Sequence, residues 1–147
     1  MLFRSFSRLD VSSRSLFALV DEGSCFAGSF LELALACDRI YHLALPDSPK
    51  TAPTITLGKL NFSAYPMATE ETRLERRFYH EKGPLDALRA VIGEALDADK
   101  AHELGLNTSN PDDIDWQDEV RIAIEERVAM SPDALTGMEA NLRFNGK

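Results

Sequence analysis

Glu32 is the residue whose surroundings are best suited to chemistry. It is the one acid in the apolar run SFLELALAC, and a carboxylate desolvated in this way has a raised pKa and can serve as a general acid or base. The preceding residues 23–28, GSCFAG, are punctuated by glycine and predict a turn that runs straight into a helix. Because the first N–H groups of a helix have no partner inside it, such a junction can bind an anion.

A structural role would also account for a carboxylate at position 32. Ser29 and Glu32 have the spacing of a capping box, in which each side chain bonds the backbone N–H of the other residue at the start of a helix. Spacing alone favours this cap over catalysis. Both interpretations stay open at the level of the sequence.

Other chemical motifs are absent or weak. Gly23 and Gly28 have the spacing of a phosphate-binding loop, but Ser29 and Phe30 stand where that loop needs Lys and then Ser or Thr. Cys25 lies in the turn, where a helix dipole could activate it, although a small buried thiol is the commoner case. The three histidines share no ligand spacing with each other or with the two cysteines, so we expect no metal.

Hydrophobic patterns predict the elements that position this turn. The fold class they indicate is α/β, in one domain without internal repeats. Strands are expected at residues 15–20, 39–44 and 54–57, with residues 61–66 as an aromatic loop. Helices are expected at residues 30–37, at 69–82 with Thr69 as N-cap, from Pro84 to Gly93, from an Asp97 cap to Gly105, at about 116–130, and from Pro132 to about Leu142.

Composition narrows the possible partners and the compartment. The chain of 147 residues is 44% hydrophobic and carries a net charge of −8, which suits a globular core and disfavours nucleic acid. No 18-residue apolar run is present, so we expect no membrane span, and two cysteines favour a reducing cytoplasm. Residues 1–17 have the composition of a transit peptide, but the spacing of Phe3, Phe6 and Leu9 favours an ordinary amphipathic helix.

Taken together, the motifs resemble the enoyl-CoA hydratase/isomerase (crotonase) superfamily. The resemblance rests on the strand, turn and helix of residues 15–38, on the proline-rich loop that follows, and on ALDADKAHELGLNT and SPDAL later in the chain. It implies that backbone N–H groups of Gly28 or Ser29 stabilise a thioester oxyanion and that Glu32 is an acid or base. Phe30 stands where the family usually has glycine.

A more specific resemblance is to a ring-opening lyase branch of that superfamily. It rests on GSCFAGSFLELALACDR, NFSAYPM, RLERRFY, PDDIDWQDEVRIAIEER and SPDALTGMEANLRF. It implies carbon–carbon cleavage of a dearomatised, aromatic-derived acyl-CoA, with the CoA moiety as part of the substrate and no other cofactor. In that branch two crotonase-like modules share one polypeptide, so residues 1–147 are expected to be a partial second module, truncated upstream and downstream.

Three functions therefore follow as hypotheses. The chain is part of a lyase of this kind, a non-catalytic scaffold or dimerisation module of it, or a generic enoyl-CoA hydratase/isomerase. The expected partners are the acyl-CoA substrate, the missing first module and further copies in a homo-oligomer. In the branch, the catalytic Cys and Glu are understood to belong to the first module, which favours a structural role for Glu32.

Overall fold

The structure, a computed structural model, describes residues 2–144, with side chains from Ser5 onward. The chain opens with helix α1 (Leu2–Asp10), which confirms the expected helix; the side chain of Phe3 lies outside the described part. Phe6 is buried on the inner face of α1, and Asp10 is buried at its end.

Two small sheets form the centre of the fold. Strand β1 (Phe17–Val20) pairs in parallel with β3 (Arg39–His42), so that Phe17 stands opposite Arg39. Strand β2 (Cys25–Ala27) pairs in parallel with β4 (Thr54–Thr56), and β4 pairs antiparallel with β5 (Ala95–Leu96). Helix α2 (Ser29–Leu35) links the two sheets, because it follows β2 and leads into β3.

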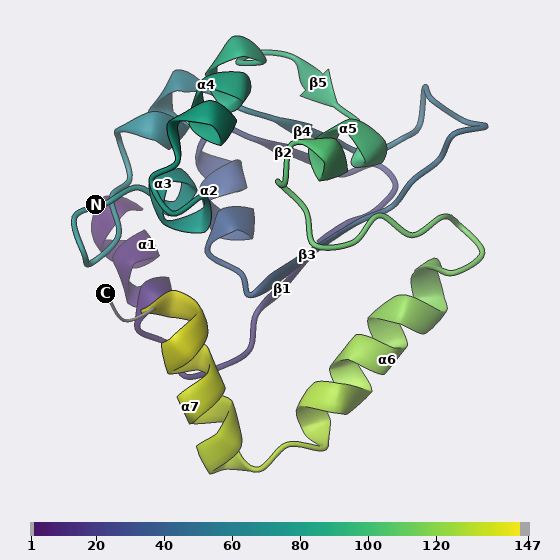
Figure 1. Cartoon of the computed structure of the whole chain (residues 1–147). Helices are drawn as coiled ribbons and strands as arrows, with labels where there is room; N and C mark the ends of the chain where they lie inside the picture. The colour runs from purple at the N-terminus through teal and green to yellow at the C-terminus, as the bar shows by residue number, and fades with distance from the viewer. Residues whose placement is uncertain (1, 145–147) are drawn as a thin grey trace.

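The remaining helices follow in chain order, and α6 and α7 occupy the lower part of the view, with the end of α7 beside α1 (Figure 1). They are η1 (Lys59–Phe62), α3 (Arg73–Arg77), α4 (Lys82–Ala90), α5 (Ala98–Glu103), α6 (Trp116–Val128) and α7 (Pro132–Arg143). The end of α7 returns to α1, where Arg143 donates a 2.6 Å hydrogen bond to the carbonyl of Leu9. No helix in the described part of the chain is both long and apolar enough to cross a membrane.

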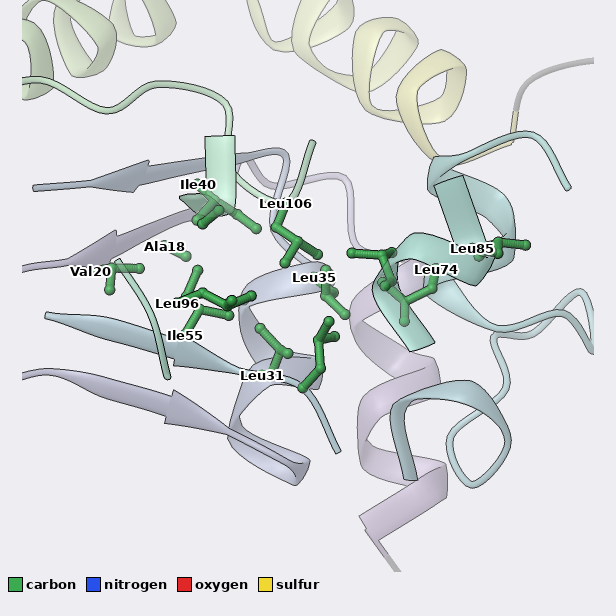
Figure 2. Close-up of a cluster of buried hydrophobic side chains, with 14 residues drawn as sticks. Ala18, Val20, Leu31, Leu35, Ile40, Ile55, Leu74, Leu85, Leu96 and Leu106 are labelled. Atoms are coloured by element: carbon green, nitrogen blue, oxygen red, sulfur yellow. The ribbon is translucent and has the colours of Figure 1, made fainter. Parts of the chain in front are cut away.

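The main core lies where the strands meet α2, α3 and α4. Figure 2 shows Leu31 and Leu35 of α2 directed into this space from one side, with strand residues such as Val20 and Ile55 on the other. A smaller cluster joins Tyr41 of β3 to Trp116 at the start of α6. Burial of these side chains fixes α2, and therefore the turn before it, against both sheets.

Most predicted elements are present, but several differ from the prediction. The expected turn at residues 23–28 contains strand β2, and the short strand β5 was not expected. The aromatic loop begins inside the short 3-10 helix η1. Strands of two or three residues give no readable hydrophobic period, so only their long-range pairing reveals them.

The predicted helix at residues 69–82 is wrong in extent. Helix α3 begins after Thr72, whose hydroxyl accepts a 3.2 Å hydrogen bond from the N–H of Glu75 and so supplies the cap that was assigned to Thr69. The helix ends early because Tyr79 and His80 have φ values of 50° and 61°, a left-handed backbone that stops helical hydrogen bonding. By contrast, the Asp97 cap is confirmed, accepting from the N–H of Lys100 at 2.9 Å.

Candidate active site

The turn before α2 is built around Gly28. Its φ of 53° lies in the left-handed region, where a side chain is strained, and it serves as the N-cap of α2 without any side-chain cap. Ser29 is then the first residue of the helix, and its N–H belongs to the group that no helical carbonyl satisfies. Gly28 and Ser29, whose N–H groups are the predicted oxyanion donors, therefore lie at the start of a helix. Both residues are half-buried.

The predicted capping box is wrong. Because Gly28 rather than Ser29 is the cap, the Ser29 hydroxyl lies 2.6 Å from the Tyr65 hydroxyl instead of bonding to the N–H of a later helical residue. Glu32 likewise turns away from the backbone of Ser29 and into the protein. The sequence has the spacing of a capping box, but the side chains of Ser29 and Glu32 bond to residues distant in the sequence instead.

Glu32 is almost completely enclosed, with 1% of its surface exposed. One carboxylate oxygen accepts a 2.7 Å hydrogen bond from the amide of Asn61, and the other accepts a 3.0 Å bond from the guanidinium of Arg73. Burial raises the pKa of Glu32, while the bonds from Asn61 and Arg73 act in the opposite direction.

Asn61 ties this carboxylate to the turn. Its amide nitrogen donates to the carbonyl of Gly28 at 2.9 Å as well as to Glu32, and its amide oxygen accepts a 2.9 Å bond from the N–H of Gly58. Asn61 itself is 1% exposed. The side chain therefore holds the loop after β4 against the turn before α2.

Arg73 carries the network onward to α1. Its second terminal nitrogen donates to the Asp10 carboxylate at 2.8 Å and to the carbonyl of Phe6 at 3.1 Å. Burial also raises the pKa of Asp10. A single guanidinium therefore bridges two buried carboxylates from different helices, which we call the Asp10–Arg73–Glu32 triad.

This geometry suits structure better than proton transfer. A general acid or base must reach the proton it moves, and both oxygens of Glu32 are already engaged by side chains. A cavity of about 190 Å³ beside the triad is lined by Asp10 and Arg73 but not by Glu32. The carboxylate consequently has no open face from which to meet a substrate.

The two thiols differ in the way that matters for reactivity. Cys25 is exposed on β2, so the expectation of a buried thiol is wrong for this residue, and its sulfur accepts a weak 3.9 Å bond from the Thr54 hydroxyl. Burial raises the pKa of the Cys37 thiol to about 11, which makes it inert near neutral pH. Among the described residues no group of His, Cys, Asp and Glu side chains is arranged to hold a metal ion.

Sequence reasoning missed three members of this site, namely Asp10, Asn61 and Arg73. The quoted motifs NFSAYPM and RLERRFY contain Asn61 and Arg73, but their role as partners of Glu32 depends on contacts 29 and 41 residues apart. One weak signal in the sequence indicated such partners. Glu32 lies in an apolar helix, and a buried carboxylate requires a cation or a strong hydrogen-bond donor nearby.

Comparison with known proteins places this geometry in context. No protein-family model matches the chain. It is 54% identical over 144 residues to the benzoyl-CoA-dihydrodiol lyase of Aromatoleum evansii, a match that covers 98% of this chain and 25% of the lyase. The chain therefore spans about a quarter of the length of that relative.

Solved structures give the fold. The enoyl-CoA hydratase of Geobacillus kaustophilus superposes with a TM-score of 0.70 at 16% identity, over 97% of this chain and 50% of its own. Human mitochondrial delta3-delta2-enoyl-CoA isomerase gives a TM-score of 0.68 at 18% identity, over 97% and 51%. The chain has the crotonase fold. It covers about half of each of these crotonase-fold chains, which confirms the predicted fold class and its partial extent.

Proposed function

We propose that this chain is part of a carbon–carbon lyase that opens the dearomatised ring of a benzoyl-CoA derivative, and that its role there is structural. The identity of 54% to a benzoyl-CoA-dihydrodiol lyase supports the enzyme class. Closure of Glu32 between Asn61 and Arg73 carries the structural role, because this geometry leaves the carboxylate no substrate-facing oxygen.

The proposal extends to the setting of the enzyme. The substrate is an aromatic-derived acyl-CoA in aerobic benzoate catabolism, and the catalytic groups lie in the remainder of the longer polypeptide. In this arrangement the Asp10–Arg73–Glu32 triad fixes the packing of α1, α2 and α3 and does not exchange protons with substrate.

The purified chain tests the proposal directly. It should give no turnover of the ring-epoxide or dihydrodiol thioester of benzoyl-CoA, since it contributes at most one side of an oxyanion hole and keeps Glu32 enclosed. Mixing it with the Aromatoleum evansii lyase from which the matched region has been deleted should restore ring opening. Turnover by the chain alone would refute the structural role, and a mixture that stays inactive after stable association would refute the lyase assignment.

One observation favours a catalytic alternative. Ser29 is half-buried and begins α2, and its hydroxyl lies 2.6 Å from the Tyr65 hydroxyl, so a thioester carbonyl could find donors there. A generic hydratase built on this turn would hydrate crotonyl-CoA. We expect no hydration, and a rate that depends on the Tyr65 hydroxyl, tested with Tyr65→Phe, would support this alternative.

A further inference from the structure

The cavity beside the triad concentrates positive charge. Its volume is about 190 Å³, and α3, α7 and the ends of α1 and α2 contribute to its wall. Within the described part of the chain its acidic lining residues are Asp10 and Asp38. Four arginines face these two acids in the lining, namely Arg73, Arg76, Arg77 and Arg143. Such an excess of cations is unexpected in a chain whose net charge is −8.

Arg77 has no acidic partner among the described residues. Its Nε donates a 2.8 Å hydrogen bond to the carbonyl of Gly105, and none of the ion pairs of the described residues includes its guanidinium. Burial lowers the pKa of Arg77, as expected for a cation that is desolvated without a compensating charge. Because Arg77 follows Arg73 by four residues, the two side chains lie on one face of α3, one turn apart. The fold therefore leaves one cation of this wall without a counter-charge.

Two further donors on the same wall lack an acceptor. The Nε atoms of Arg73 and Arg143 are buried and form no hydrogen bond within the described part of the chain. Arg73 is 3% exposed and Arg143 is 7% exposed. A buried N–H group without an acceptor is destabilising, so an acceptor bound in the cavity would be favourable.

Apolar side chains complete the wall and its mouth. Met67 is buried, whereas Leu142 of α7 is 49% exposed and Tyr79, just after α3, is 69% exposed. The cavity therefore reaches the surface between the end of α3 and α7. An engineered apolar cavity of about 150 Å³ binds benzene, so a space of about 190 Å³ can hold a molecule with one ring and a charged group.

We propose that this cavity binds a small organic carboxylate. The charged group pairs with Arg77, because a guanidinium matches a carboxylate with two parallel hydrogen bonds, and the rest of the ligand lies against Met67 and Leu142. Asp10 would repel the ligand, but it is bonded to Arg73, one helical turn from Arg77. This inference does not rest on the proposed lyase function.

Calorimetric titration of the purified chain with three probes tests the chemistry of the ligand. Benzoate combines a carboxylate with one ring, and it should bind saturably, one per chain, with a Kd of about 1 mM or tighter. Benzamide has the same shape without the charge, and inorganic phosphate has charge without an apolar part. Each of these should bind at least about tenfold more weakly than benzoate.

Substitutions test the place of the ligand. Arg77→Met should weaken benzoate binding at least about tenfold, whereas Arg77→Lys keeps the charge and should weaken it less. Arg89→Met is a matched control, since Arg89 pairs with Asp86 on the exposed face of α4 and does not line the cavity, so the affinity should not change. Circular dichroism and thermal melting of each variant would show that the fold is kept.

A change at the mouth keeps the test independent of Arg77. Leu142→Trp adds bulk to a half-exposed residue of α7, so the protein should still fold, while the narrowed cavity should weaken benzoate binding by about threefold or more.

Three results would overturn the inference. One is the absence of saturable benzoate binding to the folded parent chain. Another is binding of benzamide or phosphate as tight as that of benzoate. The third is a folded Arg77→Met or Leu142→Trp chain that keeps the parent affinity, which would place the benzoate elsewhere.

Discussion

Replacing Arg73 by methionine should cost a large part of the folding stability. The side chain of Arg73 is 2% exposed, and its guanidinium bonds Glu32 at 3.0 Å and Asp10 at 2.8 Å. Methionine fills similar volume but leaves two buried carboxylates without a cation, and removing one partner of a buried ion pair typically costs about 3–5 kcal/mol. A domain of this size has a total stability of about 5–15 kcal/mol, so the loss should be about a fifth of it or more.

Urea unfolding followed by tryptophan fluorescence and circular dichroism measures this loss. Arg121→Met is a matched control, because Arg121 also bonds two carboxylates, Asp118 at 3.1 Å and Glu125 at 3.0 Å, but on the exposed face of α6. Its unfolding midpoint should stay within experimental error of the parent, since solvent screens such pairs. If Arg73→Met lost less than about 1 kcal/mol, the triad would not hold α1, α2 and α3 together.

Three further predictions concern protonation, thiol access and backbone conformation. Burial raises the pKa of Glu32 above 4.5, so the folded state binds the proton more tightly than the unfolded state, and the contribution of Glu32 to stability falls as pH rises from about 4. The free energy of unfolding of Glu32→Gln should therefore depend less on pH over this range. An unchanged pH dependence would contradict the raised pKa of Glu32. At pH 8 a maleimide should label Cys25 in the native protein much faster than Cys37, because Cys37 is half-buried and has a pKa of about 11. Equal labelling rates of the two native thiols, followed by mass spectrometry, would contradict this difference. Gly105→Ala should destabilise the protein by about 1–2 kcal/mol, because φ is 73° and the new methyl carbon would lie 3.0 Å from the ring of Phe78. Gly137→Ala, inside α7 and in open space, should stabilise it by about 0.5–1 kcal/mol. Equal shifts of the melting temperature in the two variants would refute this distinction.

The elements that were predictable from the sequence have local causes. The Asp97 cap is formed as expected, and Ser131 caps the helix that was expected to begin at Pro132, because a polar side chain before a helix satisfies N–H groups within three residues. The apolar run of β1 and the buried face of α2 likewise follow from hydrophobic period. Such features do not depend on distant parts of the chain.

The site was less predictable because its contacts are distant in sequence. Ser29 and Glu32 have the spacing of a capping box, yet a left-handed Gly28 takes the cap position and Asn61 and Arg73 capture the carboxylate. The spacing of residues within a helix predicts which backbone N–H groups a side chain can reach. It does not predict which donors from distant parts of the sequence compete for that side chain. The environment that raises the pKa of Glu32 was foreseen in kind, whereas its complete enclosure was not.

The rate of the assembled enzyme tests the structural role of Glu32 most directly. The measurement is kcat for ring opening by the deleted Aromatoleum evansii lyase complemented with the parent chain or with Glu32→Gln, each at saturating chain and with its fold verified. Glutamine has the size of the carboxylate but cannot transfer its proton. We predict kcat values within about twofold of each other, whereas a fall of about 100-fold or more in a folded, associated variant would identify Glu32 as a catalytic acid or base and contradict the account.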